Sequence, residues 1–551
     1  MRTTIKLTVA VALSSVLLSC GQGPSKKDFE IEKGIFEPTW ESLMENNQFP
    51  KWFKDAKFGI WAHWGVQCVP EAGDWYARNM YIQGEGAYRH HRATYGHPSE
   101  FGFMNFIPMW KAEKWDPEAL MKLYVNAGAK YFVAMANHHD NFDNYDSKYQ
   151  PWNSVNMGPQ QDLVDGWAKA ARAEGLKFGV SNHAAHAWHW FQTSYGYDPE
   201  GDMAGVRYDA YNITKKDGKG KWWEGYDPQD FYGKPVMVPP AGITTIDSMN
   251  KWHDKNDRIW SEKIPEGDPE FAPTWFLRTK ELVDKYQPDL LYFDDTELPL
   301  EQYGLDIVAH YYNSSVNKNN GVNNVVVTTK GLTPEHQKGV TLDCERGSIG
   351  GISQYPWQTC SCIGGWHYSQ STYDRDRYKS VELIVKTLVD IVSKNGNLLL
   401  SIPVKGDGSI DDKEVAFLEG MGEWMKIHGE GIYGTRPWKI FGEGVANTTG
   451  EGSFGSRERE QASLSARDVR FTTKDGKLYT FVLGFPRDKT VEISALGFDS
   501  PQLEGKEITK ISMLGTDKEI KWQQNADKLI ITMPEVENTG KTIGFVVEGV
   551  I

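Results

Sequence analysis

Cysteine is scarce in this chain of 551 residues, which contains only five. Four of them, Cys68, Cys344, Cys360 and Cys362, lie beyond the N-terminal segment. So few cysteines do not build a disulfide framework for a chain of this length, and we expect the hydrophobic core to stabilise the fold. The pair at 360 and 362 lacks the spacing of a zinc or redox motif, and no HExxH sequence occurs. We therefore expect neither a metal ion nor an organic cofactor.

Runs of lysine and arginine are also missing, and the net charge is −14. Nucleic acids bind to clustered positive charge, so we expect no nucleic-acid partner. No glycine-rich phosphate loop follows an expected strand, which disfavours a nucleotide-binding fold. Aromatic residues, in contrast, make up 13% of the chain and include 21 tryptophans. Flat apolar rings can pack against the C–H faces of sugars, so this composition hints at a carbohydrate ligand.

The N-terminus resembles a bacterial lipoprotein signal. Arg2 and Lys6 precede an apolar run, Leu7–Leu18, which is too short for a permanent transmembrane helix and ends before Cys20. We expect residues 1–19 to be removed, Cys20 to carry the lipid and residues 20–35 to form a tether. This predicts an exported lipoprotein, in the periplasm or on the outer-membrane surface, that meets a membrane only through its anchor. An ordinary secretory signal is the alternative.

Residues 36–438 alternate between helical and strand patterns. Helices are predicted at 117–127, 163–174, 271–286, 305–317, 381–393 and 413–428. Strands are predicted at 55–65 (running into a loop), 130–136, 176–180, 290–293, 325–329, 340–344 and 398–403. This alternation is typical of parallel βαβ units, and we predict an α/β catalytic domain with a (β/α)8-like TIM barrel.

Residues 439–551 have a different pattern. Short β-prone runs at 469–473, 477–484, 490–495, 507–513, 520–523, 529–532 and 543–548 are separated by turns. They predict a C-terminal antiparallel β-sandwich, and the polar stretch 447–466 is predicted to be a loop.

Two adjacent carboxylates end the apolar run Leu290–Phe293. A buried parallel strand of a barrel delivers reactive groups in this way, at its carboxyl end. Asp294 is therefore our candidate nucleophile. The alternative is that Asp294 or Asp295 only caps the following helix.

His138, His139 and Asp140 directly follow another apolar strand. Buried polar groups are unfavourable unless they bind something or each other, and neutral imidazoles can bind sugar hydroxyls. Structural hydrogen bonding and metal binding are the alternatives, although neighbouring side chains on an extended segment point to opposite sides. His63 lies at a further strand end.

Several motifs, taken in order, resemble glycoside hydrolase family 29, the α-L-fucosidases. They are Lys57–Gly65, His138–Asp140, Asp146–Tyr149, Trp152–Ser154, Asp162–Val164, Gly175–Gly179, Pro288–Asp294, Asn395–Leu400 and Gly429–Trp438. The resemblance implies a retaining exo-glycosidase that removes terminal α-L-fucosyl residues from oligo- or polysaccharides by double displacement. It also implies a distorted barrel with a C-terminal β-sandwich and a fucosylated carbohydrate substrate.

The resemblance assigns roles to individual residues. Asp294 becomes the nucleophile, and a second carboxyl group must protonate the leaving oxygen from about 5–5.5 Å away. Residues implied to bind or enclose the sugar are His63, Asp74, Trp75, His138, His139, Tyr292 and Trp366.

The acid/base carboxyl is not where many relatives have it. They carry a Trp-Glu pair, whereas this chain has Trp357-Gln358, and an amide cannot donate a proton as an acid. Glu345, at the end of the expected strand 340–344, is the best remaining candidate, followed by Glu297 and Glu71.

Two further departures leave alternative functions open. Asn141 and Asp295 stand where the family commonly has glycine. Added polarity in the pocket could accept the 6-hydroxyl of L-galactose, which gives an α-L-galactosidase acting on algal galactans as one alternative. Loss of the Trp-Glu carboxyl favours another, a catalytically inactive surface glycan-binding lipoprotein.

Overall fold

The computed structural model describes residues 24–446, 450–452, 455, 458–537 and 541–551. The predicted signal segment and Cys20 lie outside these residues. Across the described part of the chain, no helix combines the length and apolar character needed to cross a membrane.

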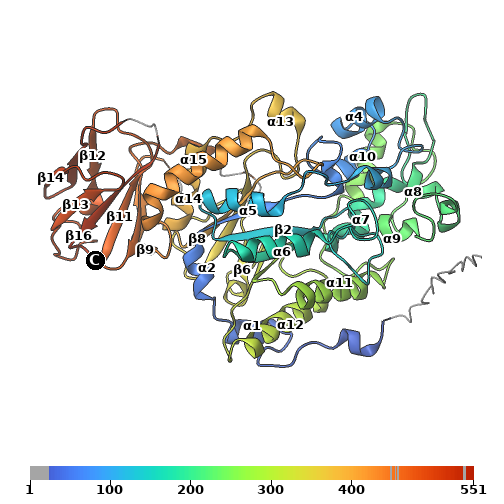
Figure 1. The fold of residues 1–551 in the computed structure, drawn as a ribbon, viewed down its shortest axis with the longest axis horizontal. Helices are drawn as coiled ribbons and strands as arrows, with labels where there is room; N and C mark the ends of the chain where they lie inside the picture. The colour runs from blue at the N-terminus through green and yellow to red at the C-terminus, as the bar shows by residue number, and fades with distance from the viewer. Residues whose placement is uncertain (1–23, 447–449, 453–454, 456–457, 538–540) are drawn as a thin grey trace, which may run out of the picture.

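Eight parallel strands form the central sheet, in the order β6-β5-β4-β3-β2-β1-β8-β7 (Figure 1). The sheet curls until Asp343, beside β6, forms a parallel bridge with Gln358 of β7. The strands are β1 (Phe58–Ala62), β2 (Tyr131–Asn137), β3 (Lys177–Asn182), β4 (Leu290–Thr296), β5 (Val326–Lys330), β6 (Thr341–Leu342), β7 (Trp357–Cys362) and β8 (Gly396–Ser401). The predicted TIM-like barrel is confirmed.

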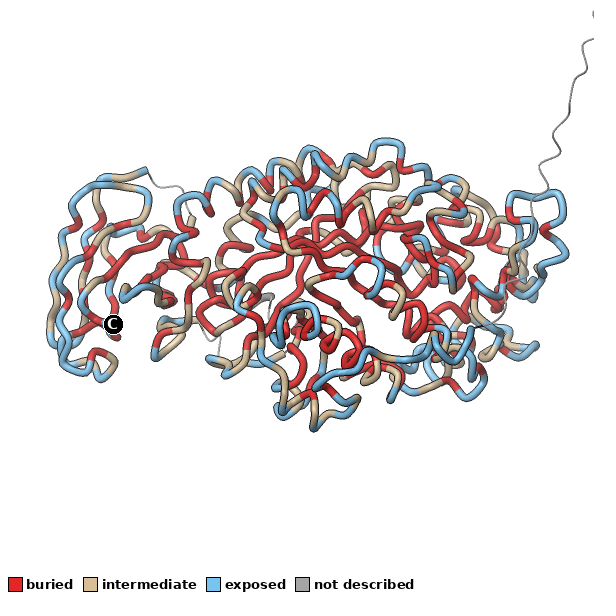
Figure 2. Tube along the Cα trace, turned by 60° about the horizontal axis from the view of Figure 1, so that its bottom comes forward, coloured by how far each residue is buried: buried red, intermediate tan, exposed pale blue. Residues whose placement is uncertain are grey.

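Both faces of the barrel strands are buried, as Figure 2 shows for the centre of the molecule. In β1, Phe58 and Ile60 join the core beneath the helices, while Trp61 joins the core inside the barrel. This alternation follows from the period of two in an extended strand. It explains why continuous apolar runs, and not alternating ones, predicted these strands.

Long helices cover the outside of the barrel, and most begin where the sequence predicts. They are α5 (Pro117–Asn126), α6 (Leu163–Ala173), α11 (Phe271–Tyr286), α12 (Gln302–Lys318), α14 (Val381–Ser393) and α15 (Asp412–His428). The side chains of Asp116, Asp162, Ser380 and Asp411 accept hydrogen bonds from the first turns of α5, α6, α14 and α15. β7 was not predicted, because polar Gln358, Thr359 and Ser361 interrupt its apolar pattern.

A long segment, residues 183–270, separates β3 from α11. It folds into short helices, including α7 (Ala187–Trp190), α8 (Asp209–Asn212), α9 (Pro228–Tyr232) and α10 (Ile246–Lys255). They lie at one end of the barrel in Figure 1. This segment therefore adds side chains above the carboxyl ends of the strands.

The C-terminal region contains two antiparallel sheets around their own apolar core. One sheet has the order β13-β16-β11-β10-β9 and the other β12-β15-β14. The strands are β9 (Arg436–Glu443), β10 (Val469–Lys474), β11 (Lys477–Val482), β12 (Thr490–Ile493), β13 (Lys510–Met513), β14 (Lys521–Gln524), β15 (Leu529–Thr532) and β16 (Ile543–Glu548). The predicted β-sandwich is confirmed, with β9 as an additional strand.

The prediction of a loop at 447–466 is wrong for one stretch, because helix α16 spans Glu458–Ser463. Polar Glu and Gln residues are good helix formers, so a polar composition alone does not specify a loop. At the other end of the chain, part of the predicted tether lies against the barrel. The backbone N–H of Glu32 donates to Nδ1 of His310 in α12, and Phe29 stacks on Phe276 of α11.

Candidate active site

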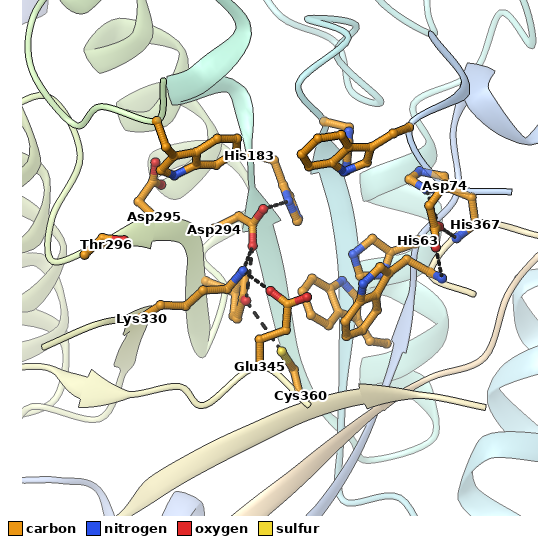
Figure 3. A pocket seen from close by; sticks show the side chains of 16 residues that line it. His63, Asp74, His183, Asp294, Asp295, Thr296, Lys330, Glu345, Cys360 and His367 are labelled. Atoms are coloured by element: carbon orange, nitrogen blue, oxygen red, sulfur yellow. Dashed lines mark hydrogen bonds and ion pairs between the residues drawn. The ribbon is translucent and has the colours of Figure 1, made fainter. Parts of the chain in front are cut away.

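A cavity of about 470 Å³ opens at the carboxyl ends of the barrel strands (Figure 3). Eight of the nine residues that the sequence predicts for catalysis or sugar binding line it: His63, Asp74, Trp75, His138, Tyr292, Asp294, Glu345 and Trp366. Its wall also contains Trp61, His183, Trp260, Asp295, Thr296, Lys330, Cys360 and His367. The loops that follow different strands therefore converge on one pocket, as the barrel geometry predicts.

Asp294, near the end of β4, is held by groups that favour its charged form. Its Oδ2 lies 3.2 Å from Nε2 of His139 and 3.2 Å from Nδ1 of His183, while Oδ1 contacts the ammonium of Lys330. Burial alone would raise the pKa of this carboxyl, but Lys330 and the two histidines hold it well below its usual range. Asp294 is therefore a carboxylate at neutral pH.

Lys330 joins Asp294 to Glu345. Its Nζ contacts Oδ1 of Asp294 and Oε2 of Glu345, and Figure 3 shows the three side chains pointing toward one another. Because both oxygens lie within hydrogen-bond distance of the same nitrogen, they are at most about 6 Å from each other. The two carboxylates consequently lie close enough to act on the same bond.

The other carboxyl candidates lie away from the cavity wall. Glu297 binds the backbone N–H of Thr333 at 2.8 Å and Nδ1 of His336 at 2.6 Å. Glu71 approaches Lys405 at 3.8 Å. Neither lines the cavity, whereas Glu345 does.

Gln358, which occupies the position of the usual Trp-Glu carboxyl, is buried outside the cavity wall. Its Nε2 donates to Asp343 at 2.9 Å, and its Oε1 accepts from the Tyr131 hydroxyl at 2.9 Å. Gln358 therefore joins β7 to β2 across the barrel and to the segment after β6.

Neutral imidazoles form one side of the cavity. Burial lowers the pKa values of His63 and His138 well below the usual range, and that of His183 is lowered as well. The Gln67 amide donates to Nδ1 of His138 at 2.9 Å, which leaves the proton of this ring on Nε2. Such rings can donate to or accept from sugar hydroxyls without adding positive charge.

His139 is the predicted sugar-binding residue that does not line the cavity. Its Nδ1 bonds the backbone carbonyl of His183 at 2.6 Å, and its Nε2 faces Asp294. The consecutive residues His138 and His139 contact different groups, so His138 faces the cavity while His139 supports the carboxylate.

Asp74 and the aromatic residues shape the entrance. Asp74 accepts from the backbone N–H groups of Trp366 at 3.1 Å and His367 at 2.6 Å, which ties the loop after β1 to the segment after β7. Trp75 is 40% exposed and stacks on Trp260 with an angle of 6° between the rings. These rings provide apolar surface at the cavity wall.

Several lining residues were missed by sequence reasoning, although two carried a usable signal. Lys330 is the last residue of β5, and His183 directly follows β3. Both obey the rule that predicted Asp294 and His138, a polar residue at the end of an apolar strand. Trp260 offered no such signal, because its segment contains no barrel strand.

Two groups among the described residues have the spacing of metal ligands. His138, His139 and His183 form the first, but two of these rings already contact Asp294. His186, Glu262 and Asp295 form the second, beside the cavity.

The family profile for alpha-L-fucosidase matches residues 25–430, and the profile for the alpha-L-fucosidase C-terminal domain matches residues 461–548. The chain belongs to the alpha-L-fucosidase family. Tissue alpha-L-fucosidase of Rattus norvegicus is 27% identical over 91% of this chain and 89% of its own length. The corresponding Homo sapiens protein is 28% identical over 91% and 88%.

Solved structures of the family have the same architecture. An alpha-L-fucosynthase of Thermotoga maritima, 26% identical, aligns over 94% of this chain and all of its own, with a TM-score of 0.65. The Thermotoga maritima alpha-fucosidase in complex with fucose, 27% identical, covers 93% of this chain and all of its own, with a TM-score of 0.62.

Asn141, where the resemblance leads us to expect glycine, adopts a backbone conformation that suits glycine. Its φ is 63°, in the left-handed region that glycine adopts freely and asparagine tolerates best among the other residues. Its side chain donates to the carbonyls of Asp230 and Phe231 and accepts from Arg278 at 2.6 Å. Asn141 thus braces the segment outside the cavity.

Proposed function

We propose that this chain hydrolyses terminal α-L-fucosyl residues of oligo- or polysaccharides with retention of configuration. Asp294 is the nucleophile and Glu345 the acid/base. The observation that carries the proposal is the pair of carboxylates, one near the end of β4 and one three residues after β6, that share the ammonium of Lys330 in one cavity. Their closeness fits a retaining site, where the carboxyl groups are about 5–5.5 Å apart, better than an inverting site at about 6.5–9.5 Å.

In the first step, an oxygen of Asp294 attacks the anomeric carbon as the bond to the leaving oxygen breaks. Glu345, in its protonated form, gives its proton to that oxygen. Lys330 and His183 keep Asp294 ionised, so the nucleophile is present without an external base.

In the second step, the ester formed on Asp294 no longer carries a full negative charge. Glu345, which lost its proton in the first step and contacts Lys330, then takes a proton from the attacking water. The water attacks the anomeric carbon from the face that the leaving group vacated, while the ester bond breaks and Asp294 leaves as a carboxylate. The configuration is therefore retained.

The rest of the cavity suits a small deoxy sugar. The rings of His63, His138 and His367 offer hydrogen-bonding groups, while Trp61 and Trp366 offer apolar faces. The relatives named alpha-L-fucosidases, and the related structure in complex with fucose, support a fucosyl substrate.

Hydrolysis of p-nitrophenyl α-L-fucoside, followed by NMR of the first-formed sugar, tests the proposal. We expect α-L-fucose as the initial product from wild type and a loss of at least about 10³-fold in kcat for Asp294→Ala. Preference for the α-L-galactoside, or β-L-fucose as the first product, would contradict it. Binding of fucosylated oligosaccharides without any cleavage would instead favour a glycan-binding protein.

We also propose that the chain is a lipoprotein anchored through Cys20, as the basic start and the short apolar run support. Labelling of cells with a clickable fatty acid should mark wild type and leave Cys20→Ser unmarked. A labelled serine variant would contradict this anchor.

A further inference from the structure

A second cluster of polar side chains lies behind the nucleophile, outside the proposed chemistry. Asp295 follows Asp294 on β4, His186 lies in the turn after β3, and Glu262 comes from the segment before α11. Nε2 of His186 is 2.8 Å from Oδ1 of Asp295 and 3.2 Å from Oε2 of Glu262. The side chains of His186 and Asp295 are fully buried.

Nε2 of His186 forms ion pairs with Glu262 and Asp295, but neither contact has the geometry of a hydrogen bond. Among the described residues, Nε2 of His186, Oε2 of Glu262 and both carboxylate oxygens of Asp295 have no hydrogen-bond partner. The two carboxylate oxygens lie 3.2 and 2.8 Å from Nε2 of His186, so distance does not prevent a hydrogen bond. They must therefore lie to the sides of the direction in which a ring N–H would point. Buried polar atoms without hydrogen bonds are rare in proteins, and a bound metal ion is one arrangement that satisfies them.

The surrounding bonds fix the orientation of two of these groups. His189 bonds the carbonyl of Asp257 through Nδ1, so its Nε2 accepts from Nδ1–H of His186 at 3.1 Å. Nε2 of His186 therefore points toward the two carboxylates. Burial alone would lower the pKa of His186, but Asp295 and Glu262 raise it to about 9, so a metal ion that binds Nε2 displaces a proton. The backbone N–H of Thr296 holds Oε1 of Glu262 at 2.9 Å, which leaves Oε2 directed at the cluster.

We propose that His186, Glu262 and Asp295 bind one divalent transition-metal ion, with Zn²⁺ as the ion that their donor set fits best. One imidazole nitrogen and two carboxylate oxygens are ordinary zinc ligands. Bond lengths of about 2.0–2.2 Å place tetrahedral ligand atoms about 3.4 Å apart. The separation between His186 and Glu262, 3.2 Å, is close to this value, and that between His186 and Asp295, 2.8 Å, is shorter. All three ligand atoms lie within 4.8 Å of one another.

The site has the supporting contacts that metal ligands usually have. The chain of His186, His189 and the Asp257 carbonyl fixes the ring that would bind the ion. The His186 ring also stacks on Trp260, with 3.7 Å between the ring centroids. A bound ion would therefore link the Trp260–Glu262 segment to β4, next to Asp294 and at the wall of the cavity.

Zn²⁺ binding to the chelator-treated, dialysed protein tests the proposal without any sugar. Isothermal titration with ZnCl₂ should give one site per chain, and Zn²⁺ should raise the melting temperature. Glu262→Gln, which keeps the shape of the side chain, should lower the affinity at least tenfold. Glu266→Gln, an exposed position four residues away, should bind as wild type does. Co²⁺ should show visible absorption bands in wild type that Glu262→Gln lacks.

Three results would overturn the proposal. They are the absence of Zn²⁺ and Co²⁺ binding in wild type, equal affinity in Glu262→Gln, and preference for Ca²⁺ over Zn²⁺. Asp295→Asn provides a second variant, and its melting curve in chelator shows whether it is folded. Because none of these measurements depends on hydrolysis, failure of the metal site and failure of the fucosidase assignment are distinguishable.

Discussion

The ammonium of Lys330 and the carboxylate of Asp294 form a buried ion pair across the carboxyl ends of neighbouring strands β5 and β4. Each group sustains the charge of the other. Asp294 and Glu345 hold the pKa of Lys330 well above its usual range, while Lys330 and the adjacent histidines hold the pKa of Asp294 low. A buried pair of this kind depends on both partners, because a single buried charge is strongly unfavourable.

Replacement of Lys330 by methionine tests this dependence. Without the ammonium, the pKa of Asp294 should rise, so the acid limb of the profile of kcat/KM against pH should move to higher pH. We expect kcat/KM at neutral pH to fall at least about 10²-fold, as when one stabilising donor of an active site is removed. Lys338→Met, at an exposed position, is the control. An unchanged acid limb would show that Lys330 does not control Asp294.

Glu345→Ala should separate the two steps of the reaction. A good leaving group such as 2,4-dinitrophenolate needs no proton, so its departure should be nearly normal in the variant. For an unactivated alcohol we expect a loss of about 10²–10⁴-fold in kcat/KM, the usual contribution of general acid catalysis. The measurement is the dependence of kcat/KM on the pKa of the leaving group. The assignment of Glu345 fails if wild type and variant show the same dependence.

The buried carboxyl of Asp209 should make the unfolding free energy depend on pH. Its buried carboxyl accepts from the hydroxyls of Tyr81 at 2.8 Å and Tyr232 at 2.5 Å, and burial raises its pKa to about 7. The unfolded value is about 3.9. The protonated group therefore adds stability that is complete below about pH 4 and is lost as the pH rises through about 7.

Asp209→Asn removes this titration. Urea unfolding at pH 5 and pH 8 should show a larger decrease in unfolding free energy for wild type than for the variant. Asp217→Asn, at an exposed site, should behave as wild type does. Parallel decreases in wild type and Asp209→Asn would contradict the raised pKa.

The contact between the barrel and the β-sandwich depends on a buried ion pair. Asp390 of α14 accepts from Nε of Arg470 of β10 at 2.6 Å, and Lys394 contacts the same carboxylate at 3.0 Å. Removing one partner of a buried pair typically costs about 3–5 kcal/mol. Asp390→Ala should therefore lower the unfolding free energy by about this amount.

The exposed pair of Lys489 and Glu535, 2.9 Å apart, is the matched control. Glu535→Gln should leave the unfolding free energy almost unchanged, because exposed ion pairs contribute little to stability. Equal effects of the two substitutions in denaturant unfolding would show that the Asp390 pair does not brace the two regions.

The sequence by itself determined the barrel, the sandwich and the positions of the main reactive groups. Continuous apolar runs predicted β2, β4 and β8 because both faces of parallel barrel strands are buried. Asp294 and His138 were found because carboxyl ends of such strands meet on one side of the barrel. Both signals involve residues close together in the chain, so they can be recognised in a single sequence.

Only the tertiary structure decided which of these side chains reach the cavity and which contact Asp294 from behind it. Glu297 and Glu345 look alike in the sequence, but only Glu345 reaches the cavity and Lys330. His138 faces the cavity while His139 turns to Asp294, and Trp260 reaches the wall from a segment that contains no barrel strand. Distances between residues on different strands are set by how the sheet closes, through contacts such as Asp343 with Gln358. These distances cannot be read from the spacing of residues along the chain, because closure of the sheet depends on the packing of the whole barrel.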